Sequence, residues 1–214
     1  MVVILLSTIE VPTRWGALPA RYNHLTHPTG SVTLAVLFPG RNYTLDAPLM
    51  WYSARAAFEA GCDVVGVEYG YQANRTELDI DELAYLFEEA AEALNNIMTG
   101  QYSNVVFIGK SIGTIVQTEI LTKVSFPVLN HVFLTPLRPI IPAIRESHRS
   151  LVVVGGSDTA FGESDIAQID NLPNVRVSVV PGADHQLETK DHRDSIDILK
   201  QVTALCRDFC RELS

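Results

Sequence analysis

A serine between two glycines is the first place in the sequence where residue types and spacing suggest chemistry. Residues 109–113 read Gly-Lys-Ser-Ile-Gly, with Ser111 at the centre, directly after the apolar run 105–108. The G-x-S-x-G pattern places a nucleophilic serine on a sharp turn between a strand and a helix, and its glycines allow the two elements to approach closely. The helix N-terminus then points its amides at developing negative charge. We predict that Ser111 is a nucleophile; the alternative is that it only caps the following helix.

A serine hydroxyl needs a base that removes its proton, and His185 fits this role. It follows the apolar run 175–180 by a short Pro-Gly-Ala-Asp segment. The other histidines lie in an early loop, at the start of a strand, in a polar loop or at the start of the last helix: His24, His27, His131, His148 and His192. Of these, only His192 is a credible rival. The remaining alternative for His185 is an ordinary surface histidine.

A third group should fix the histidine tautomer and stabilise the imidazolium. Asp158 ends the Gly-Gly-Ser-Asp segment that follows the apolar run 151–154. The chain order Ser, Asp, His agrees with that of hydrolases that carry the G-x-S-x-G turn. Asp158 could instead only stabilise its own turn. Asp165, Asp170 and Asp184 are weaker candidates for the acid.

Two backbone N–H groups should bind the oxygen of the attacked carbonyl as it gains charge. Ile112 follows the nucleophile and would supply one. The loop at 38–43, Phe-Pro-Gly-Arg-Asn-Tyr, would supply the other from Arg41. The guanidinium of Arg41 could hold a substrate carboxylate or phosphate, and a solvated side chain is equally compatible with the sequence.

Short apolar runs alternate with amphipathic stretches, which favours parallel strands joined by helices. The expected strands are 2–6, 31–38, 62–67, 105–108, 131–134, 151–154 and 175–180, and the expected helices are 48–60, 77–98, 111–123 and 191–213. Continuous apolar runs indicate strands that are covered on both faces. We therefore predict an α/β fold with three α/β/α layers, a doubly wound and mostly parallel sheet. Helix 77–98 should turn its glutamates, including Glu89, towards solvent.

Composition limits the remaining classes of protein. The 214 residues are 47% hydrophobic and carry a formal net charge of −9, which suits one domain over residues 1–214 and argues against a nucleic-acid partner. Three cysteines do not suggest a disulfide framework, and we expect Cys206 and Cys210 to be reduced thiols on a packed helix face. No metal, cofactor or membrane partner is predicted. The sequence shows no secretory signal, so we expect a cytoplasmic protein.

Together, residues 31–185 resemble the α/β-hydrolase superfamily, particularly its small lidless members related to dienelactone hydrolases and carboxylesterases. The resemblance rests on the segments 109–113, 155–158 and 182–185, and it implies Ser111 as nucleophile, Asp158 as acid and His185 as base. Two departures stand out. Many relatives have His-Gly in the oxyanion loop where this chain has Pro39-Gly40, and dienelactone hydrolases proper use a cysteine nucleophile.

The resemblance implies a serine hydrolase that cleaves a small-molecule ester or thioester through an acyl-enzyme. About fifteen residues separate the strands 131–134 and 151–154, which leaves no room for a large lid and favours small substrates. We place Asn42, Tyr43, Pro136 and Phe161 in the substrate pocket; core packing explains Pro136 and Phe161 equally well. An inactive binding module, an acyltransferase or a peptidase on the same scaffold are the alternatives. The sequence does not indicate the oligomeric state.

Overall fold

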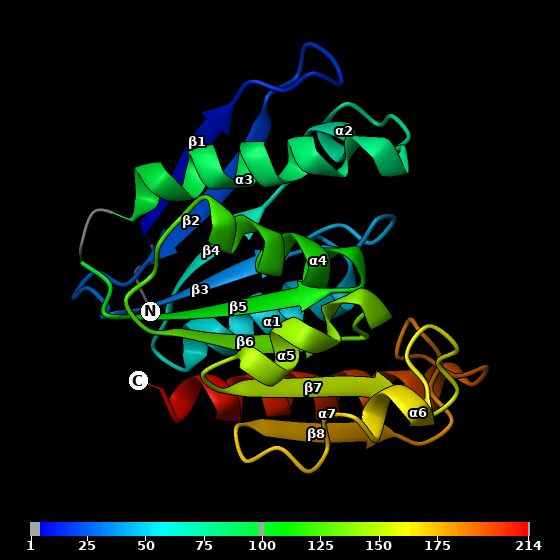
Figure 1. Cartoon of the computed structure of the whole chain (residues 1–214). Coiled ribbons are helices and arrows are strands. Elements are labelled where there is room, and N and C mark those ends of the chain that lie inside the picture. Colours follow the sequence, from blue (N-terminus) through cyan, green and yellow to red (C-terminus); the bar gives the residue numbers. More distant parts are fainter. Residues whose placement is uncertain (1–4, 99–100, 214) are drawn as a thin grey trace.

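A single sheet of eight strands forms the centre of the computed structural model, which describes residues 5–98 and 101–213 (Figure 1). The strand order is β1-β2-β4-β3-β5-β6-β7-β8. β1 and β2 pair antiparallel, β2 joins β4 antiparallel, and all other neighbours are parallel. The prediction of a doubly wound, mostly parallel α/β sheet is therefore confirmed.

The elements follow one another in a regular alternation after the first two strands. The strands are β1 Leu5–Val11, β2 Ala20–Thr26, β3 Thr33–Phe38, β4 Asp63–Val67, β5 Asn104–Lys110, β6 Leu129–Leu134, β7 Ser150–Gly155 and β8 Val175–Val180. The α-helices are α1 Pro48–Glu59, α2 Gly70–Ala73, α3 Leu83–Ile97, α4 Ile112–Glu119, α5 Ile141–Glu146, α6 Glu163–Ile166 and α7 His192–Arg211. Short 3₁₀ turns occupy η1 Ile80–Glu82, η2 Ile120–Thr122 and η3 Arg138–Ile140.

Helices cover both faces of the sheet, with α3 and α4 on one side and α1 and α7 on the other (Figure 1). Successive residues of the central strands therefore enter opposite cores. Phe107 of β5 packs with the α3 and α4 side, whereas Ile108 packs with the α1 and α7 side. This explains the continuous apolar runs in the sequence. Cys206 and Cys210 lie fully buried in the second core, as expected for thiols on a packed helix face.

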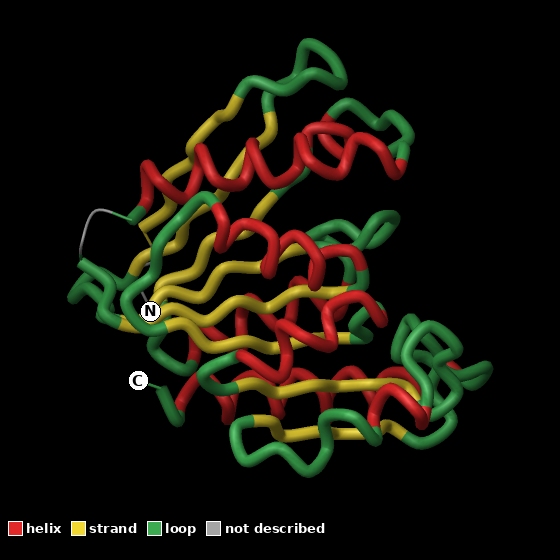
Figure 2. Tube along the Cα trace, in the orientation of Figure 1, coloured by secondary structure: helices red, strands yellow, loops and turns green. Residues whose placement is uncertain are grey.

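The strand order reverses between β3 and β5. The chain leaves β3 through α1 to β4 on one side, and then crosses through α3 to β5 on the other side of β3. Ligands of open α/β sheets bind at such a reversal, beyond the carboxyl ends of the strands. The tube in Figure 2 shows the loops after the parallel strands gathered at one end of the sheet. The loop after β3 and the start of α4 flank this point.

The first hairpin corrects the sequence analysis. A strand was expected at 2–6, but β1 runs from Leu5 to Val11, and residues 2–4 lie outside the described part of the chain. β2 was not predicted, so His24 lies in a strand and not in an early loop. β1 is an almost wholly exposed edge strand, and β2 buries little beyond Ala20 and Tyr22. Such one-sided strands lack a continuous apolar run.

The helix expected at 77–98 begins later and is less solvated than expected. Asp79 and Glu82 form a capping box in which Asp79 N–H donates to Glu82 Oε2 at 3.2 Å, and α3 begins only after that turn. Glu89 is also an exception to the expected glutamate face. Its side chain is buried, and its Oε2 accepts the Gly70 N–H at 3.0 Å. No helix within the described residues is long and apolar enough to cross a bilayer.

His131 makes the stability of this core depend on pH. Its ring is buried, stacks on Phe133 and accepts a hydrogen bond from Gln117 Nε2 at Nδ1, 3.2 Å away. Burial lowers the pKa of His131 from 6.5 to about 3. The unfolded chain therefore binds a proton that the folded chain does not, and the free energy of unfolding falls as pH drops below about 6.5.

We expect wild-type protein to lose about 1 kcal/mol of unfolding free energy from this histidine between pH 7 and pH 5.5. His131→Gln cannot titrate and should lose correspondingly less over the same interval. Urea unfolding at the two pH values measures the difference. Equal pH dependence in the two proteins would show that His131 charges without cost in the folded state.

Candidate active site

The structure brings Ser111, His185 and Asp158 together at the carboxyl ends of β5, β8 and β7. His185 Nε2 lies 2.9 Å from Ser111 Oγ, and His185 Nδ1 lies 2.8 Å from Asp158 Oδ2. The Asp158 carboxyl is fully buried, while the His185 side chain is 29% exposed. The arrangement thus runs from a buried acid to a base and a hydroxyl that substrate can reach. With Nδ1–H donating to the carboxylate, Nε2 is free to accept the serine proton.

The backbone at Ser111 is strained in the manner that a nucleophile turn requires. Ser111 has φ 51° and ψ −117°, which non-glycine residues rarely adopt. Its hydroxyl makes no capping hydrogen bond to α4, which removes the alternative of a simple helix cap. Thr114 ties this turn to the helix instead, since its N–H and its Oγ1 both donate to the Ser111 carbonyl, at 2.9 and 2.6 Å.

Gly113 permits the close approach of β3 to this turn. A Cβ at Gly113 would lie 2.1 Å from the Phe38 carbonyl oxygen and 2.6 Å from that of Pro39. No real side chain tolerates such distances, so only glycine lets the loop after β3 reach the N-terminus of α4. The second glycine of the G-x-S-x-G pattern therefore brings the loop after β3, which carries the candidate amide of Arg41, close to the N-terminus of α4.

The peptide between Gly40 and Arg41 is held in a fixed orientation. The Gly40 carbonyl accepts a hydrogen bond from Gln72 Nε2 at 2.8 Å. In a trans peptide the next N–H points opposite to the carbonyl, so the Arg41 N–H points away from Gln72. That N–H has no acceptor within the described residues. Ile112 N–H occupies the first position of α4, where no intrahelical acceptor exists.

Side chains of α2 and the residue before it hold this loop, and the sequence analysis missed them. Tyr71 Oη donates to the Arg41 carbonyl at 2.6 Å, Gln72 Nε2 reaches the same oxygen at 3.3 Å, and Tyr69 Oη donates to the Pro39 carbonyl at 3.3 Å. Three successive carbonyls of the loop thus point towards α2. No motif in the sequence marks these residues, because their partners lie about thirty positions away.

A second unforeseen group is Lys110, the residue before the candidate nucleophile Ser111. Its side chain is only 1% exposed, and Nζ donates to the His185 carbonyl at 3.1 Å and to Thr135 Oγ1 at 3.3 Å. Nζ also lies 4.7 Å from the centroid of the Tyr43 ring. Lys110 therefore connects β5 with the loops after β3, β6 and β8.

Burial lowers the pKa of the Lys110 amine from 10.5 to about 8, and the negative charges of Asp158, Asp184 and Glu188 act in the opposite direction. The charged form of Lys110 has thus lost hydration on burial, which costs free energy. The hydrogen bond to the His185 carbonyl is the contact by which Lys110 holds the loop that carries His185.

Lys110→Met should lower kcat about tenfold to a hundredfold with little change in KM, because it releases the loop that carries His185 from β5. Steady-state kinetics on a small ester measure the effect, with near-UV circular dichroism as the check on folding. Lys123→Met is the matched control. Its amine lies at the surface, where its ion-pair partner Glu88 is as far as 3.9 Å away. Unchanged kcat in folded Lys110→Met protein would contradict a positioning role.

Asp184 organises the turn that presents His185. Asp184 Oδ1 accepts the N–H groups of Gln186 at 2.7 Å and Glu188 at 3.2 Å. Asp184, one of the weaker candidates for the acid, therefore stabilises a turn. Gly155 brings this turn against β7, because a Cβ there would lie 2.3 Å from the Asp184 carbonyl oxygen. The loops of Asp158 and His185 are thus built as one unit.

The other candidates from the sequence lie apart from this constellation. His192 is 82% exposed at the start of α7, and Asp165 pairs with Arg138 at 2.9 Å. The Arg41 guanidinium donates to the Leu78 carbonyl at 2.5 Å. Of the pocket candidates, Tyr43 lines a hollow beside the loop of His185, Asn42 is exposed, Pro136 is buried, and Phe161 is buried in an apolar cluster close to Asp158.

Comparisons with known proteins agree with this geometry at the level of the fold. No protein-family model matches the sequence, and a search of curated proteins finds no significant match. Solved structures do match. A protein of unknown function from Agrobacterium tumefaciens, described as an α/β hydrolase, superimposes with a TM-score of 0.73 over 98% of this chain and 96% of its own, at 14% identity. This chain has the α/β-hydrolase fold.

Two further α/β-hydrolase structures match over nearly the whole chain. An esterase from Pyrococcus furiosus gives a TM-score of 0.68 at 12% identity, covering 98% of this chain and 93% of that one. A serine hydrolase without a lid from Xanthomonas campestris gives 0.64 at 18% identity, covering 96% and 94%. The lidless α/β-hydrolase architecture agrees with the short connection between β6 and β7, which holds only η3 and α5.

Proposed function

We propose that this chain is a serine hydrolase that cleaves small carboxylic esters or thioesters through an acyl-enzyme on Ser111. The observation that carries the proposal is the continuous hydrogen-bonded line from Asp158 through His185 to Ser111, with distances of 2.8 and 2.9 Å. The strained backbone of Ser111 supports it, since such strain concentrates at functional sites.

The proposed reaction begins when His185 Nε2 accepts the Ser111 proton as Oγ attacks the carbonyl carbon of the ester. The carbonyl oxygen becomes an oxyanion, which the N–H groups of Arg41 and Ile112 bind. Collapse of this intermediate breaks the bond to the leaving oxygen or sulfur, which takes the proton from His185. Water then attacks the acyl-enzyme with His185 as base, and the acid is released.

The substrate class follows from the surroundings of the site. No large insertion covers the carboxyl ends of β5, β7 and β8, so the serine is open to small acyl groups. The names of two structural neighbours, the Pyrococcus furiosus esterase and the Xanthomonas campestris serine hydrolase, point in the same direction. No cofactor is required by this chemistry. Within the described residues, no cluster of three or more His, Cys, Asp or Glu is arranged for a metal ion.

Labelling with a fluorophosphonate, followed by mass spectrometry of peptides, tests the proposal. We expect one adduct on Ser111 of the wild type, none in Ser111→Ala, and strongly reduced labelling in His185→Ala. Ser164→Ala removes an exposed serine of α6 and should label like the wild type. Hydrolysis of p-nitrophenyl acetate should follow the same pattern.

Folded wild-type protein that does not label would overturn the proposal in favour of a binding module on a hydrolase scaffold. If labelling occurs but p-nitrophenyl acetate is consumed only when an alcohol, thiol or amine is added, the enzyme is an acyltransferase. Cleavage of a peptide panel in preference to esters would make it a peptidase.

A further inference from the structure

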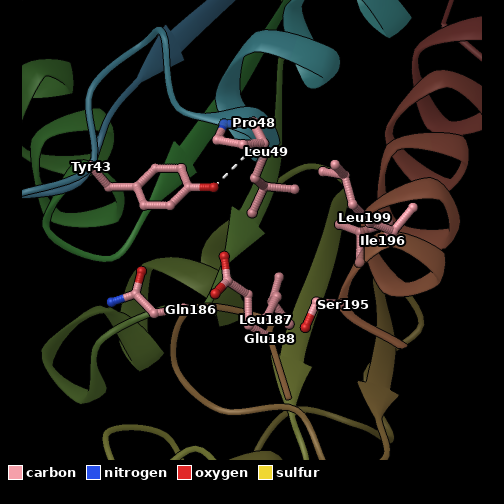
Figure 3. Close-up of a pocket in the computed structure, with 10 residues that line it drawn as sticks. Tyr43, Pro48, Leu49, Gln186, Leu187, Glu188, Ser195, Ile196 and Leu199 are labelled. Carbon is pink, nitrogen blue, oxygen red and sulfur yellow. Dashed lines mark hydrogen bonds between the residues drawn. The ribbon is translucent and has the colours of Figure 1, made fainter. Parts of the chain in front are cut away.

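A small apolar hollow lies beside the loop that carries His185 (Figure 3). Its walls come from the loop after β3, the start of α1, the segment after His185 and the first turns of α7. Tyr43, Leu49, Leu187, Ile196 and Leu199 are among its apolar lining residues, and the volume is about 130 Å³. Figure 3 shows these side chains surrounding a common space, with Gln186 and Glu188 at one side.

The hollow adjoins the candidate triad on two sides. Gln186 and Leu187, which line it, follow His185 directly in the chain. Tyr43, which lines it as well, is close to the candidate nucleophile: a Cβ built at Gly40 would be 3.1 Å from Tyr43 Cβ and 3.8 Å from Ser111 Cβ. Two walls of the hollow, Tyr43 and the segment after His185, therefore also border the candidate triad.

The walls are held rigidly. Tyr43 Oη accepts the Leu49 N–H at 3.0 Å, which fixes the ring against the start of α1. Leu187 is 3% exposed although its φ of 61° is unfavourable for leucine. Two hydrogen bonds hold that turn, from Leu187 N–H to the Asp184 carbonyl at 3.0 Å and from Asp184 N–H to the Glu188 carbonyl at 2.9 Å. The turn thus holds Leu187 in the wall of the hollow, next to His185, in spite of its unfavourable backbone conformation.

The polar atoms of the hollow do not favour a charged ligand. Ser195 Oγ donates to the carbonyls of Thr189 and Asp191, at 3.2 and 3.0 Å, and accepts the Thr189 N–H at 3.0 Å. Its one proton is therefore already shared between two carbonyls, and it has no hydrogen left to donate to a substrate. Glu188 adds a carboxylate at the rim, which repels an anionic group.

We propose that this hollow is the subsite for an uncharged apolar group of the substrate, about the size of a short acyl chain or a phenyl ring. An apolar cavity of roughly 150 Å³ accepts benzene, so a hollow of this volume suits groups of about four to six carbon atoms. The inference rests on the proposed function, because it presupposes that Ser111 is acylated. It names the substrate class of that reaction as small neutral esters with one hydrophobic substituent.

Two ester series test the subsite in the full-length protein. One varies the acyl chain of p-nitrophenyl esters from acetate to dodecanoate, and the other varies the alcohol of alkyl and benzyl acetates. We expect kcat/KM in one series to rise about tenfold from two carbons to between four and six, and then to stop rising or fall. The series in which kcat/KM changes with chain length shows whether the acyl group or the alcohol group of the ester enters the hollow. A hemisuccinyl ester should be a much poorer substrate than the neutral ester of equal length.

Leu199→Trp fills the hollow from α7 and should abolish the preference for four to six carbons, and fluorophosphonate labelling of the same variant shows separately whether Ser111 is still reactive. Ile196→Trp, at the exposed rim, serves as a second variant if the first does not fold. Gln201→Trp puts the same ring on α7 outside the hollow and should keep the wild-type preference.

Chain-length profiles that are the same for Leu199→Trp, Ile196→Trp and Gln201→Trp in both ester series would overturn the subsite, even though labelling of Ser111 would still support the hydrolase. Equal rates for hemisuccinyl and neutral esters would also overturn it. Loss of all labelling in the wild type would overturn the proposed function and this subsite with it.

Discussion

Asp158→Asn is expected to lower kcat for a small ester by about a thousandfold to ten-thousandfold while the protein stays folded. Asp158 Oδ2 accepts the Nδ1–H of His185 at 2.8 Å, and Oδ1 accepts the Ala160 N–H at 2.8 Å. An asparagine that keeps the bond to Ala160 presents its NH₂ group to Nδ1. The imidazole must then carry its proton on Nε2, where it faces Ser111 Oγ and cannot accept the serine proton.

The measurement is kcat and KM of wild type and Asp158→Asn on p-nitrophenyl butyrate, with thermal unfolding to verify the fold. Asp170→Asn is the matched control, because Asp170 is an exposed carboxylate in the same region and was a rival candidate from the sequence. A loss of less than tenfold in Asp158→Asn would mean that another group orients His185. An equal loss in both variants would point to a general charge effect.

The residues of the candidate triad could be proposed from the sequence because each stands in a local pattern. Ser111, Asp158 and His185 all follow a buried apolar run within a few residues, and glycines such as Gly113 and Gly155 mark the turns. Continuous apolar runs also reveal parallel strands reliably, since both faces of such strands are covered. The order of elements then places the three ends at one edge of the sheet.

What the sequence analysis missed depends on long-range contacts or on weak periodicity. α2 is four residues long, so it shows no amphipathic pattern, and the role of Gln72 exists only because β4 lies next to β3. Lys110 looks like a variable residue within the G-x-S-x-G segment until the fold brings the His185 carbonyl to its Nζ. Glu89 was assigned to solvent because helical spacing does not show that α2 supplies an N–H partner.

Apart from Glu89, the supporting groups share one property: each donates a hydrogen bond to a backbone carbonyl near the candidate triad and leaves the proposed chemistry to other residues. Gln72 and Tyr71 fix the loop after β3, Lys110 fixes the loop after β8, and Thr114 fixes the nucleophile turn. A G-x-S-x-G segment with a suitable histidine therefore indicates which atoms would react. We expect kcat to depend also on how rigidly the surrounding backbone N–H groups are oriented towards the oxyanion.

Gln72→Leu is the direct test of that rigidity. It removes the hydrogen bonds from Nε2 to the Gly40 carbonyl at 2.8 Å, to the Arg41 carbonyl at 3.3 Å and to Tyr71 Oη at 3.2 Å, and keeps a side chain of similar size. The peptide between Gly40 and Arg41 can then rotate, so the Arg41 N–H no longer points at the oxyanion. Loss of one oxyanion donor costs about a hundredfold to a thousandfold in kcat, and a loosened donor should cost roughly ten- to a hundredfold.

Because the oxyanion exists only after attack, KM should change little while kcat falls. Gln168→Leu, which removes a surface amide that donates to the Ser164 carbonyl of its own turn at 3.1 Å, should leave both parameters unchanged. Tyr71→Phe removes the 2.6 Å hydrogen bond to the Arg41 carbonyl and should produce a smaller loss of the same kind. If Gln72→Leu raised KM at constant kcat, Gln72 would act on substrate binding, and the loop after β3 would not be the source of the second oxyanion amide.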